Sequence, residues 1–166
     1  MERRFGVSVY KEKFNFCSAH FLLFADGSRE ELHGHNYRVF VDIDGPIGEG
    51  DMVIDFMVLK PMVKEICDQI DHRTLIPSES PYLRIEKIDG LVWVHHGEDR
   101  FAFPERDVII LPLPNTSTER LAEHVCGELR TRILATVPNA QLDRLRVSVE
   151  ESSGQCGHYE ERHSRG

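Results

Sequence analysis

The chain has 166 residues, of which 40% are apolar and 29% are charged. These values are ordinary for a soluble globular protein, and we expect residues 1–166 to form a single domain with its own core. The 28 acidic residues outnumber the 20 basic ones and leave a net charge of −8, which argues against a nucleic-acid-binding protein because such proteins usually carry a basic patch.

Membrane insertion and secretion are also not expected. No apolar run approaches the roughly 20 residues that a membrane helix needs, and the first segment, "MERRFGVSVYKEKF", lacks the apolar part of a signal peptide. The four cysteines are widely spaced without a CxxC pair. Reduced thiols and a cytoplasmic location are therefore the expectation.

The first part of the chain predicts two strands. The run from Val7 to His20 changes the parity of its apolar residues partway, and a bulge near Lys11–Lys13 would explain the change because one extra residue resets the alternation. The next strand, "HGHNYRVFVDIDG", ends at Gly45-Pro46. Its alternate residues share one face: His33, His35, Tyr37, Val39, Val41 and Ile43.

Helices and shorter strands follow. "DFMVLKPMVKEICDQI" has apolar residues at helical spacing, and its proline predicts a loose turn followed by a regular helix that begins at about Pro61. Hairpin turns at Asp89-Gly90 and His96-Gly97 divide "LRIEKIDGLVWVHHGEDRFAFP" into strands. "TSTERLAEHVCGELRTRIL" predicts a second helix with a capping box at Thr116 and Glu119.

"LDRLRVSVEES" predicts a last strand. The order of elements is therefore strand, strand, helix, hairpin, helix and strand. Such a mixture is typical of an α+β fold, with an antiparallel sheet and two helices packed on one of its faces.

Three histidines could meet at the end of the first two strands. His33 and His35 are two residues apart, so both imidazoles leave the same face, and His20 would lie opposite them if the strands pair across Phe21–Leu32. Three neutral imidazoles form the ligand set of an open catalytic zinc site, in which the metal lowers the pKa of a bound hydroxyl. A polar strand at the surface has the same spacing, so both interpretations stay open.

Asp71 and His72 are adjacent just after the first predicted helix. A neighbouring carboxylate and imidazole can act as a general acid/base unit, because the aspartate orients the histidine and holds its proton. The same pair could also belong to the helix terminus, because a histidine near a helix C-terminus interacts favourably with the helix dipole and aspartate is common in turns.

Glu151 shares the parity of Val147 and Val149, whereas Glu150 points to the other face. A carboxylate on the apolar face needs a partner. A ligand with adjacent N–H donors, such as a pterin or guanine ring, would satisfy it, and so would an arginine.

Taken together, these segments resemble the 6-pyruvoyl-tetrahydropterin synthase family, whose members include the 6-carboxytetrahydropterin synthases. The matching stretches follow the family order from about residue 5 to 160: "FCSAH", "LHGHNYRV", "GDMVIDFMVLK", "IDHRTL", "LPNTSTERLAEHV" and "VEESSGQCGHYE". The resemblance implies the T-fold, assembled into trimers and stacked hexamers with active sites at subunit interfaces.

The resemblance also implies roles for the candidate residues. Zn²⁺ would be bound by His20, His33 and His35. Asp71 and His72 would form the acid/base pair, and Glu151 would grip the ring N–H and amino group of a pterin substrate.

One departure from the family pattern concerns the catalytic cysteine that precedes the HGH motif, because the loop from Phe21 to Leu32 contains none. "REELHGHNY" resembles the glutamate variant of the family, in which a glutamate replaces that cysteine, and we align this position with Glu30, with Glu31 as second choice. Cys17 is no simple substitute, because its odd offset from His20 places it on the opposite face.

The glutamate variants cleave the side chain of 7,8-dihydroneopterin triphosphate and release 6-hydroxymethyl-7,8-dihydropterin, a folate precursor. This activity is the favoured expectation, with a Glu30 whose pKa is raised by burial beside the pterin. Two alternatives remain: a 6-pyruvoyl- or 6-carboxytetrahydropterin synthase with a relocated nucleophile, and a catalytically silent pterin-binding protein.

The remaining histidines carry weaker expectations. His95 and His96 are interpreted as a solvated hairpin tip and His124 as a surface residue of the second helix. His158, after the last predicted strand, resembles a family tail that lines or braces the pocket, and His163 belongs to a frayed terminus.

Overall fold

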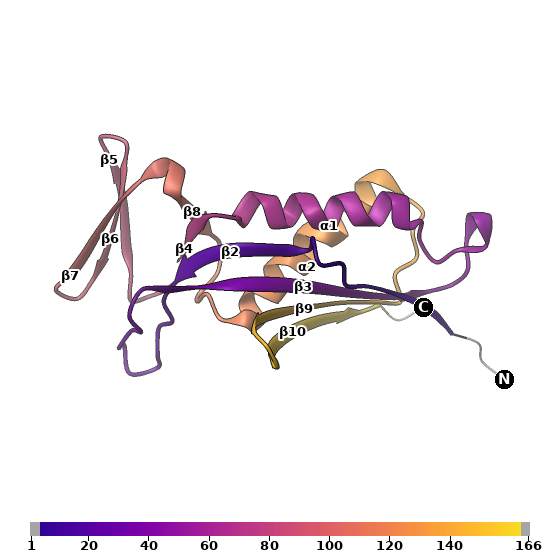
Figure 1. Cartoon of the computed structure of the whole chain (residues 1–166), viewed down its shortest axis with the longest axis horizontal. Coiled ribbons are helices and arrows are strands. Elements are labelled where there is room, and N and C mark those ends of the chain that lie inside the picture. Colours follow the sequence, from indigo (N-terminus) through magenta and orange to yellow (C-terminus); the bar gives the residue numbers. More distant parts are fainter. Residues whose placement is uncertain (1–3, 164–166) are drawn as a thin grey trace.

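The computed structural model describes residues 4–163, which form an α+β fold with two helices (Figure 1). The helices are α1 (Phe56–Ile70) and α2 (Thr118–Thr136), and two short 3-10 segments lie at Glu49–Asp51 and Glu105–Asp107. The strands are β1 (Phe5–Val9), β2 (Asn15–His20), β3 (His33–Gly45), β4 (Arg73–Pro77), β5 (Arg84–Ile88), β6 (Leu91–His96), β7 (Asp99–Pro104), β8 (Val108–Leu111), β9 (Arg144–Ser152) and β10 (Gln155–Arg162).

The main sheet has seven strands in the order β10-β9-β3-β2-β4-β8, with β1 paired to the far part of β3. The α+β prediction is confirmed. The sheet is mixed rather than purely antiparallel, because β4 runs parallel to both β2 and β8. Both helices pack on one face of it and form the larger apolar core with the inward side chains of β3 and β9. Among residues 4–163, no helix combines the length and the hydropathy needed to cross a membrane.

The predicted irregularity within the run from Val7 to His20 is present, but it is larger than one residue and divides the run into β1 and β2. Val9 lies beside Val41 and Asn15 beside Arg38, so six steps along the outer chain match three along β3. The extra chain forms a turn in which the Phe14 amide donates to the carbonyl of Lys11 over 2.9 Å. Three extra residues are an odd number, so they reset the parity as one residue would.

The predicted start of the first helix at Pro61 is wrong. The helix begins at Phe56, and Asp55 caps it by accepting a hydrogen bond of 2.7 Å from the amide of Met57. Pro61 lies inside the helix, where its fixed φ is compatible and the helix lacks one backbone hydrogen bond. The cap therefore determined the boundary, and the proline did not.

The N-cap of the second helix lies one residue later than predicted. Ser117 is the N-cap and accepts from the amide of Arg120 at 3.4 Å, so the capping role predicted for Thr116 is wrong.

The prediction that "LDRLRVSVEES" is the last strand is also wrong. A turn at Gly154, with φ of +82°, leads into β10, which pairs antiparallel with β9 and carries His158. The amide of His163 donates to the carbonyl of Asp143, so His163 is held rather than frayed as predicted.

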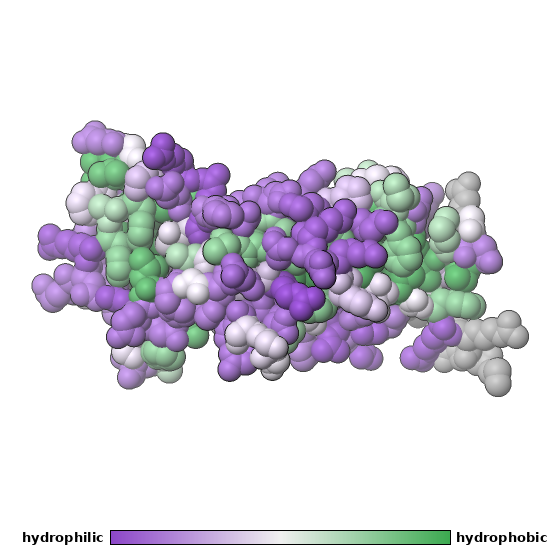
Figure 2. Space-filling view, viewed as in Figure 1, coloured by the Kyte–Doolittle hydropathy of each residue, from purple (hydrophilic) through white to green (hydrophobic). Residues whose placement is uncertain are grey.

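The hairpin region between the helices forms a separate three-stranded sheet, β5-β6-β7, which projects at one end of the molecule (Figure 1). Its first turn contains Asp89 and Gly90, both at positive φ, as the Asp-Gly pair predicts. A second apolar cluster lies beneath it and includes Phe21, Leu23, Ile76, Val92 and Val94. Figure 2 shows a band of hydrophobic residues over the same end of the molecule.

Candidate functional site

Three imidazoles converge where β2 ends and β3 begins. His20 is the cross-strand neighbour of His33, and His35 is two residues farther along β3. The ring centroid of His20 lies 4.8 Å from that of His33 and 5.3 Å from that of His35. One ligand nitrogen from each histidine can be chosen so that all three lie within 4.8 Å of one another. The pairing expected from the sequence thus brings the three candidate ligands together.

Hydrogen bonds to the backbone orient two of these rings. The Nδ1 of His20 lies 3.1 Å from the carbonyl oxygen of Thr116 and 3.3 Å from its hydroxyl, and the Nδ1 of His33 lies 2.8 Å from the carbonyl oxygen of Glu31. A protonated Nδ1 leaves Nε2 with a lone pair, as a metal ligand requires. These contacts therefore select the ligating tautomer.

The donor set fits a metal ion. Within residues 4–163, the buried Nε2 of His20 has no hydrogen-bond partner, so its lone pair is available to a metal ion. The Nε2 atoms of His33 and His35 are 3.0 Å apart. Two nitrogens at roughly 2.0–2.1 Å from a tetrahedral zinc would be about 3.4 Å apart, so a small adjustment suffices. The histidine triad could therefore hold a metal ion.

Electrostatics favour the neutral form of the buried ligand. Burial, followed by the proximity of His33, lowers the pKa of His20 from 6.5 to about 4. A metal ligand must be unprotonated. His20 is consequently ready to bind a cation near neutral pH without first losing a proton.

Two carboxylates lie at the rim of the triad. An oxygen of Glu30 is 3.8 Å from Nε2 of His33, and an oxygen of Glu151 is 3.9 Å from Nε2 of His35. Both side chains are partly open, at 35% and 28% exposure. Glu31 differs, because its side chain is exposed while only its carbonyl oxygen contacts His33. The geometry thus favours Glu30 over Glu31 as the carboxylate of this site.

Strand parity separates the two glutamates near the end of β9. Glu150 lies beside Arg38 on the outer face, where their charged atoms are 3.5 Å apart, and it also accepts from the amide of Gly154 at 3.2 Å. Glu151 faces the triad and has no arginine within ion-pair distance among the described residues. Of the two partners that the sequence left open, a ligand therefore has more support than an arginine.

Thr116 and Tyr37 also belong to this site, and the sequence did not identify them as functional. Thr116 is fully buried, and its hydroxyl donates to the carbonyl of Phe21 at 3.1 Å as well as lying near His20. Tyr37 stacks on Phe16 and packs edge-on against His35. Its buried hydroxyl has no hydrogen-bond partner within residues 4–163, and burial raises its pKa. The only sequence signal for Tyr37 was its parity with the histidines.

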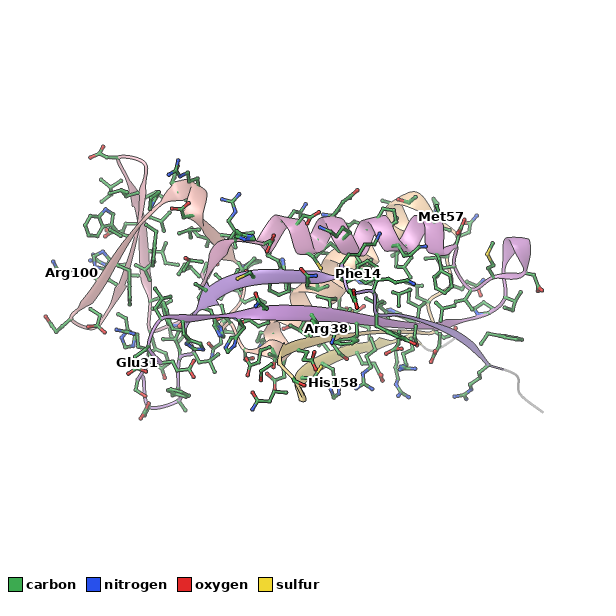
Figure 3. All side chains as sticks on the ribbon, in the orientation of Figure 1. Phe14, Glu31, Arg38, Met57, Arg100 and His158 are labelled. Atoms are coloured by element: carbon green, nitrogen blue, oxygen red, sulfur yellow. The ribbon has the colours of Figure 1, made fainter. Side chains whose placement is uncertain are left out.

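Asp71 and His72 do not reach the triad of the same chain. Asp71 accepts from the amide of Cys17 at 2.7 Å, and its other oxygen lies 2.8 Å from Nδ1 of His72. Together with Cys17, Asn36 and Arg38, they line a depression of about 540 Å³. Strand alternation puts those three side chains on the opposite face from the histidines, and Figure 3 places Arg38 on the side of β3 away from α1.

The Asp71–His72 pair nevertheless has the geometry of a paired carboxylate and imidazole. Burial alone would raise the pKa of Asp71, but hydrogen bonds from the Cys17 amide and from His72 outweigh it and keep this pKa below its usual value. The His72 side chain is 81% exposed. His72 also has a φ of +55°, and its backbone amide donates a hydrogen bond of 2.7 Å to the carbonyl of Cys17. The pair is therefore held in place but open to a partner.

Two further histidine predictions need correction. His96 is not a solvated tip, because its Nε2 lies 2.7 Å from the carbonyl oxygen of Gly27, and His95 lies 3.0 Å from a carboxylate oxygen of Glu86. His124 is half-buried on α2 rather than at the surface, and burial lowers its pKa. Among residues 4–163, the metal-ligating side chains that come together are those of His20, His33 and His35, and none of these three other histidines joins them.

Comparison with known proteins identifies the family. The sequence model of the 6-pyruvoyl tetrahydropterin synthase family matches residues 8–162. The chain belongs to this family. A family member from Methanocaldococcus jannaschii, named a putative 6-carboxy-5,6,7,8-tetrahydropterin synthase, is 33% identical over 145 residues, which cover 87% of this chain and 88% of the relative.

Solved structures of the family agree with this assignment. The 6-pyruvoyl tetrahydropterin synthase of Plasmodium falciparum is 31% identical and has a TM-score of 0.90, covering 98% of this chain and 100% of that one. The Plasmodium vivax enzyme has the same TM-score at 30% identity, with the same coverage. Two of its structures are described as catalytic residue mutants, in which a glutamate is replaced by alanine or by cysteine.

A shorter match concerns a different activity. A dihydroneopterin monophosphate aldolase of Pyrococcus furiosus is 44% identical over 46 residues, covering 28% of this chain and 40% of that protein. The relatives of this chain thus include proteins whose names refer to synthases and one whose name refers to an aldolase.

Proposed function

We propose that this family member is a zinc-dependent lyase that cleaves the side chain of 7,8-dihydroneopterin triphosphate to 6-hydroxymethyl-7,8-dihydropterin, a step of folate biosynthesis. The observation that carries the proposal is the carboxylate of Glu30, 3.8 Å from a triad nitrogen, in a loop that contains no cysteine. The catalytic glutamate of the Plasmodium vivax enzyme and the aldolase of Pyrococcus furiosus support the same interpretation.

The chain's own residues divide the work. Zn²⁺ bound by His20, His33 and His35 would lower the pKa of a substrate side-chain hydroxyl. Glu30 then takes the hydroxyl proton. The oxygen becomes the carbonyl of a departing phosphorylated aldehyde, the carbon–carbon bond breaks, and the electron pair enters the dihydropterin ring before a proton returns to the side-chain carbon. A carboxylate suits this role when the bound pterin excludes water from it.

Glu151 orients the ring for this reaction. It faces the triad, with its carboxylate 3.9 Å from His35 and 28% exposed. A carboxylate in this place can accept two parallel hydrogen bonds from the ring N–H and the amino group of a pterin, and burial by the ring would strengthen both bonds.

Asp71 and His72 would act in the site of a neighbouring subunit. They lie on the outer face of the sheet in their own chain, where His72 is 81% exposed. An oligomer that brings this face against the triad of the next subunit would supply the acid that returns the proton. We therefore propose a homo-oligomer, a trimer or hexamer, whose active sites lie at subunit interfaces.

The test is product analysis with matched variants. Zinc-loaded protein is incubated with 7,8-dihydroneopterin triphosphate, and the oxidised products are separated by chromatography. We expect 6-hydroxymethylpterin from the native protein, its loss by about 10²–10⁴-fold in Glu30→Gln because the base is gone, and retention in Glu31→Gln, whose side chain is exposed. A 6-pyruvoyl or 6-carboxy product from the native protein would refute the cleavage proposal.

A specific observation favours a second candidate, a 6-pyruvoyl- or 6-carboxytetrahydropterin synthase. Cys17 is exposed, and its amide donates to the Asp71 carboxylate at 2.7 Å, so an accessible thiol lies beside the Asp71–His72 pair. If Cys17→Ala abolishes turnover, the synthase reading gains support. A third candidate, a silent binding protein, predicts tight pterin binding with no product from any variant.

A further inference from the structure

The loop that carries Glu30 is a compact unit of its own. Residues Leu23 and Arg29 form a bridge, and the amide of Phe24 donates to the carbonyl of Ser28 at 2.8 Å. The amide of Glu30 donates to the carbonyl of Leu22 at 2.9 Å. These bonds close the loop on itself but do not attach it to the main sheet beyond its ends.

The attachments come from distant parts of the chain. The side-chain amide of Asn115 donates to the carbonyl of Leu23 at 2.8 Å and its oxygen accepts from the amide of the same residue at 3.2 Å. Two further contacts come from the three-stranded sheet and the segment before it. Tyr82, just before β5, donates its hydroxyl to the carbonyl of Ala25 at 3.1 Å, and Nε2 of His96, at the end of β6, lies 2.7 Å from the carbonyl oxygen of Gly27. Figure 3 shows Glu31 and Arg100 of β7 at the same end of the molecule.

Arg29 is the attachment nearest to the candidate base. Its Nε and Nη2 donate to one carboxylate oxygen of Asp99 at 2.9 and 2.6 Å. Its Nη1 donates to the carbonyl oxygen of Glu30 at 2.8 Å. The guanidinium also lies over the ring of Phe101, 4.9 Å from the centroid, and that ring stacks on Phe21. One planar group therefore binds β7, an aromatic stack and the Glu30 peptide at once.

These contacts hold the Glu30 backbone on both sides. Its amide is bonded to Leu22 and its carbonyl to Arg29, and the Leu22 amide in turn donates to the Glu30 carboxylate at 3.3 Å. A residue fixed in this way presents its carboxylate at one place beside His33. Misplacement of a reacting group by about 1 Å can lower a rate by about 10²-fold.

We propose that Arg29, clamped by Asp99 and stacked on Phe101, is a positioning residue that sets the placement of Glu30 and so decides which bond of the substrate side chain breaks. The second half of this inference rests on the proposed function. The three-stranded sheet β5-β6-β7 is then a support for the catalytic loop, since β7 supplies both Asp99 and Phe101.

If the Arg29–Asp99 ion pair only stabilised the fold, its loss would change the free energy of unfolding little. The side chain of Asp99 is 52% exposed, and ion pairs open to solvent contribute about 0–1 kcal/mol to stability. Lysine cannot replace arginine here, because an ammonium group has no planar fork to bind Asp99 and the Glu30 carbonyl while stacking on a ring. Arg29→Lys therefore retains the charge and removes the positioning.

The experiment compares Arg29→Lys and Asp99→Asn with Lys87→Gln. Lys87 lies on β5 and pairs with Glu105 at 3.6 Å, so its variant removes an ion pair from the same sheet without touching the loop. In zinc-loaded protein we expect kcat to fall about 10–100-fold in Arg29→Lys, and less in Asp99→Asn, with KM within about twofold. The ratio of 6-hydroxymethyl to 6-pyruvoyl product should shift in both, and neither kcat nor the ratio should change in Lys87→Gln.

Backbone hydrogen exchange supplies a readout that needs no turnover. The Glu30 amide should exchange faster in Arg29→Lys and Asp99→Asn than in native protein or Lys87→Gln. Native kcat and an unchanged product ratio in both variants, or unchanged exchange at Glu30, would overturn the inference. If exchange responds as expected while native protein forms no 6-hydroxymethyl product, the positioning role stands and the proposed cleavage reaction fails.

Discussion

Replacing Thr116 by valine tests how the fold prepares the metal site. Thr116 is fully buried, and its hydroxyl donates to the Phe21 carbonyl at 3.1 Å while lying 3.3 Å from Nδ1 of His20. Valine has nearly the same shape, so no cavity forms, but the Phe21 carbonyl loses a donor and His20 loses one of two acceptors. The change therefore isolates the hydroxyl.

The two consequences have different sizes. A buried group left without its partner costs about 1–3 kcal/mol, which lowers Tm by roughly 2–10 °C in a protein of this length. Loss of a group that orients a metal-bound histidine weakens metal affinity by about 10–100-fold. The backbone carbonyl of Thr116, 3.1 Å from the same nitrogen, remains. We therefore expect the lower end, about tenfold weaker Zn²⁺ binding.

Ser117→Ala is the matched control. Ser117 is adjacent and caps α2, so its loss destabilises the protein by about 1 kcal/mol without touching His20. Thermal unfolding of the metal-free proteins measures stability, and competition with a chromogenic chelator measures Zn²⁺ affinity. Thr116→Val should affect both and Ser117→Ala only the first. Equal Zn²⁺ affinities for the two variants would refute the orienting role of the hydroxyl.

Two further predictions concern assembly and pH. If Asp71 and His72 serve the site of a neighbouring subunit, mixing unfolded Glu30→Gln and His72→Ala chains and refolding them together should restore about one quarter of native turnover, because random assembly joins intact halves at that frequency; no recovery in verified mixed oligomers would contradict shared sites. Metal-free protein should lose stability as pH falls from 6.5 toward 4, because burial lowers the folded-state pKa of His20 to about 4 and the unfolded chain binds the proton first. Urea unfolding should show a loss of about 3 kcal/mol, which is absent in His20→Gln. An equal loss in that variant would assign the effect to other groups.

Sequence patterns predicted the elements whose signals are local. The strand His33–Gly45 was placed with its observed bounds, because alternation and a Gly-Pro end are properties of neighbouring residues. The turn at Asp89-Gly90 was also predicted, because a two-residue hairpin turn requires positive φ and an Asp-Gly pair tolerates it. Pairing of the first two strands then made the three histidines neighbours, and parity distinguished Glu151 from Glu150.

Errors arose where a local signal had two possible uses. Thr116 has the spacing of a capping box, yet the next residue caps the helix and the Thr116 hydroxyl bonds to Phe21, 95 residues earlier. Pro61 suggested a helix start, but the Asp55 cap set the boundary five residues before it. No local sequence pattern decides between such alternative caps and helix starts, because burial in the folded protein determines which hydrogen bonds must be made.

The sequence by itself determined the α+β class, the face shared by His33 and His35, and the carboxylates available to the site. Only the tertiary structure decided that Glu30 rather than Glu31 lies beside the triad, that Asp71 and His72 occupy the opposite face, and that Arg29 is held by Asp99. The physical reason is distance along the chain. Periodicity and turn chemistry act over a few residues, whereas the contacts that place Glu30 join residues 70 positions apart, and such contacts exist only once the sheet and its extension are assembled.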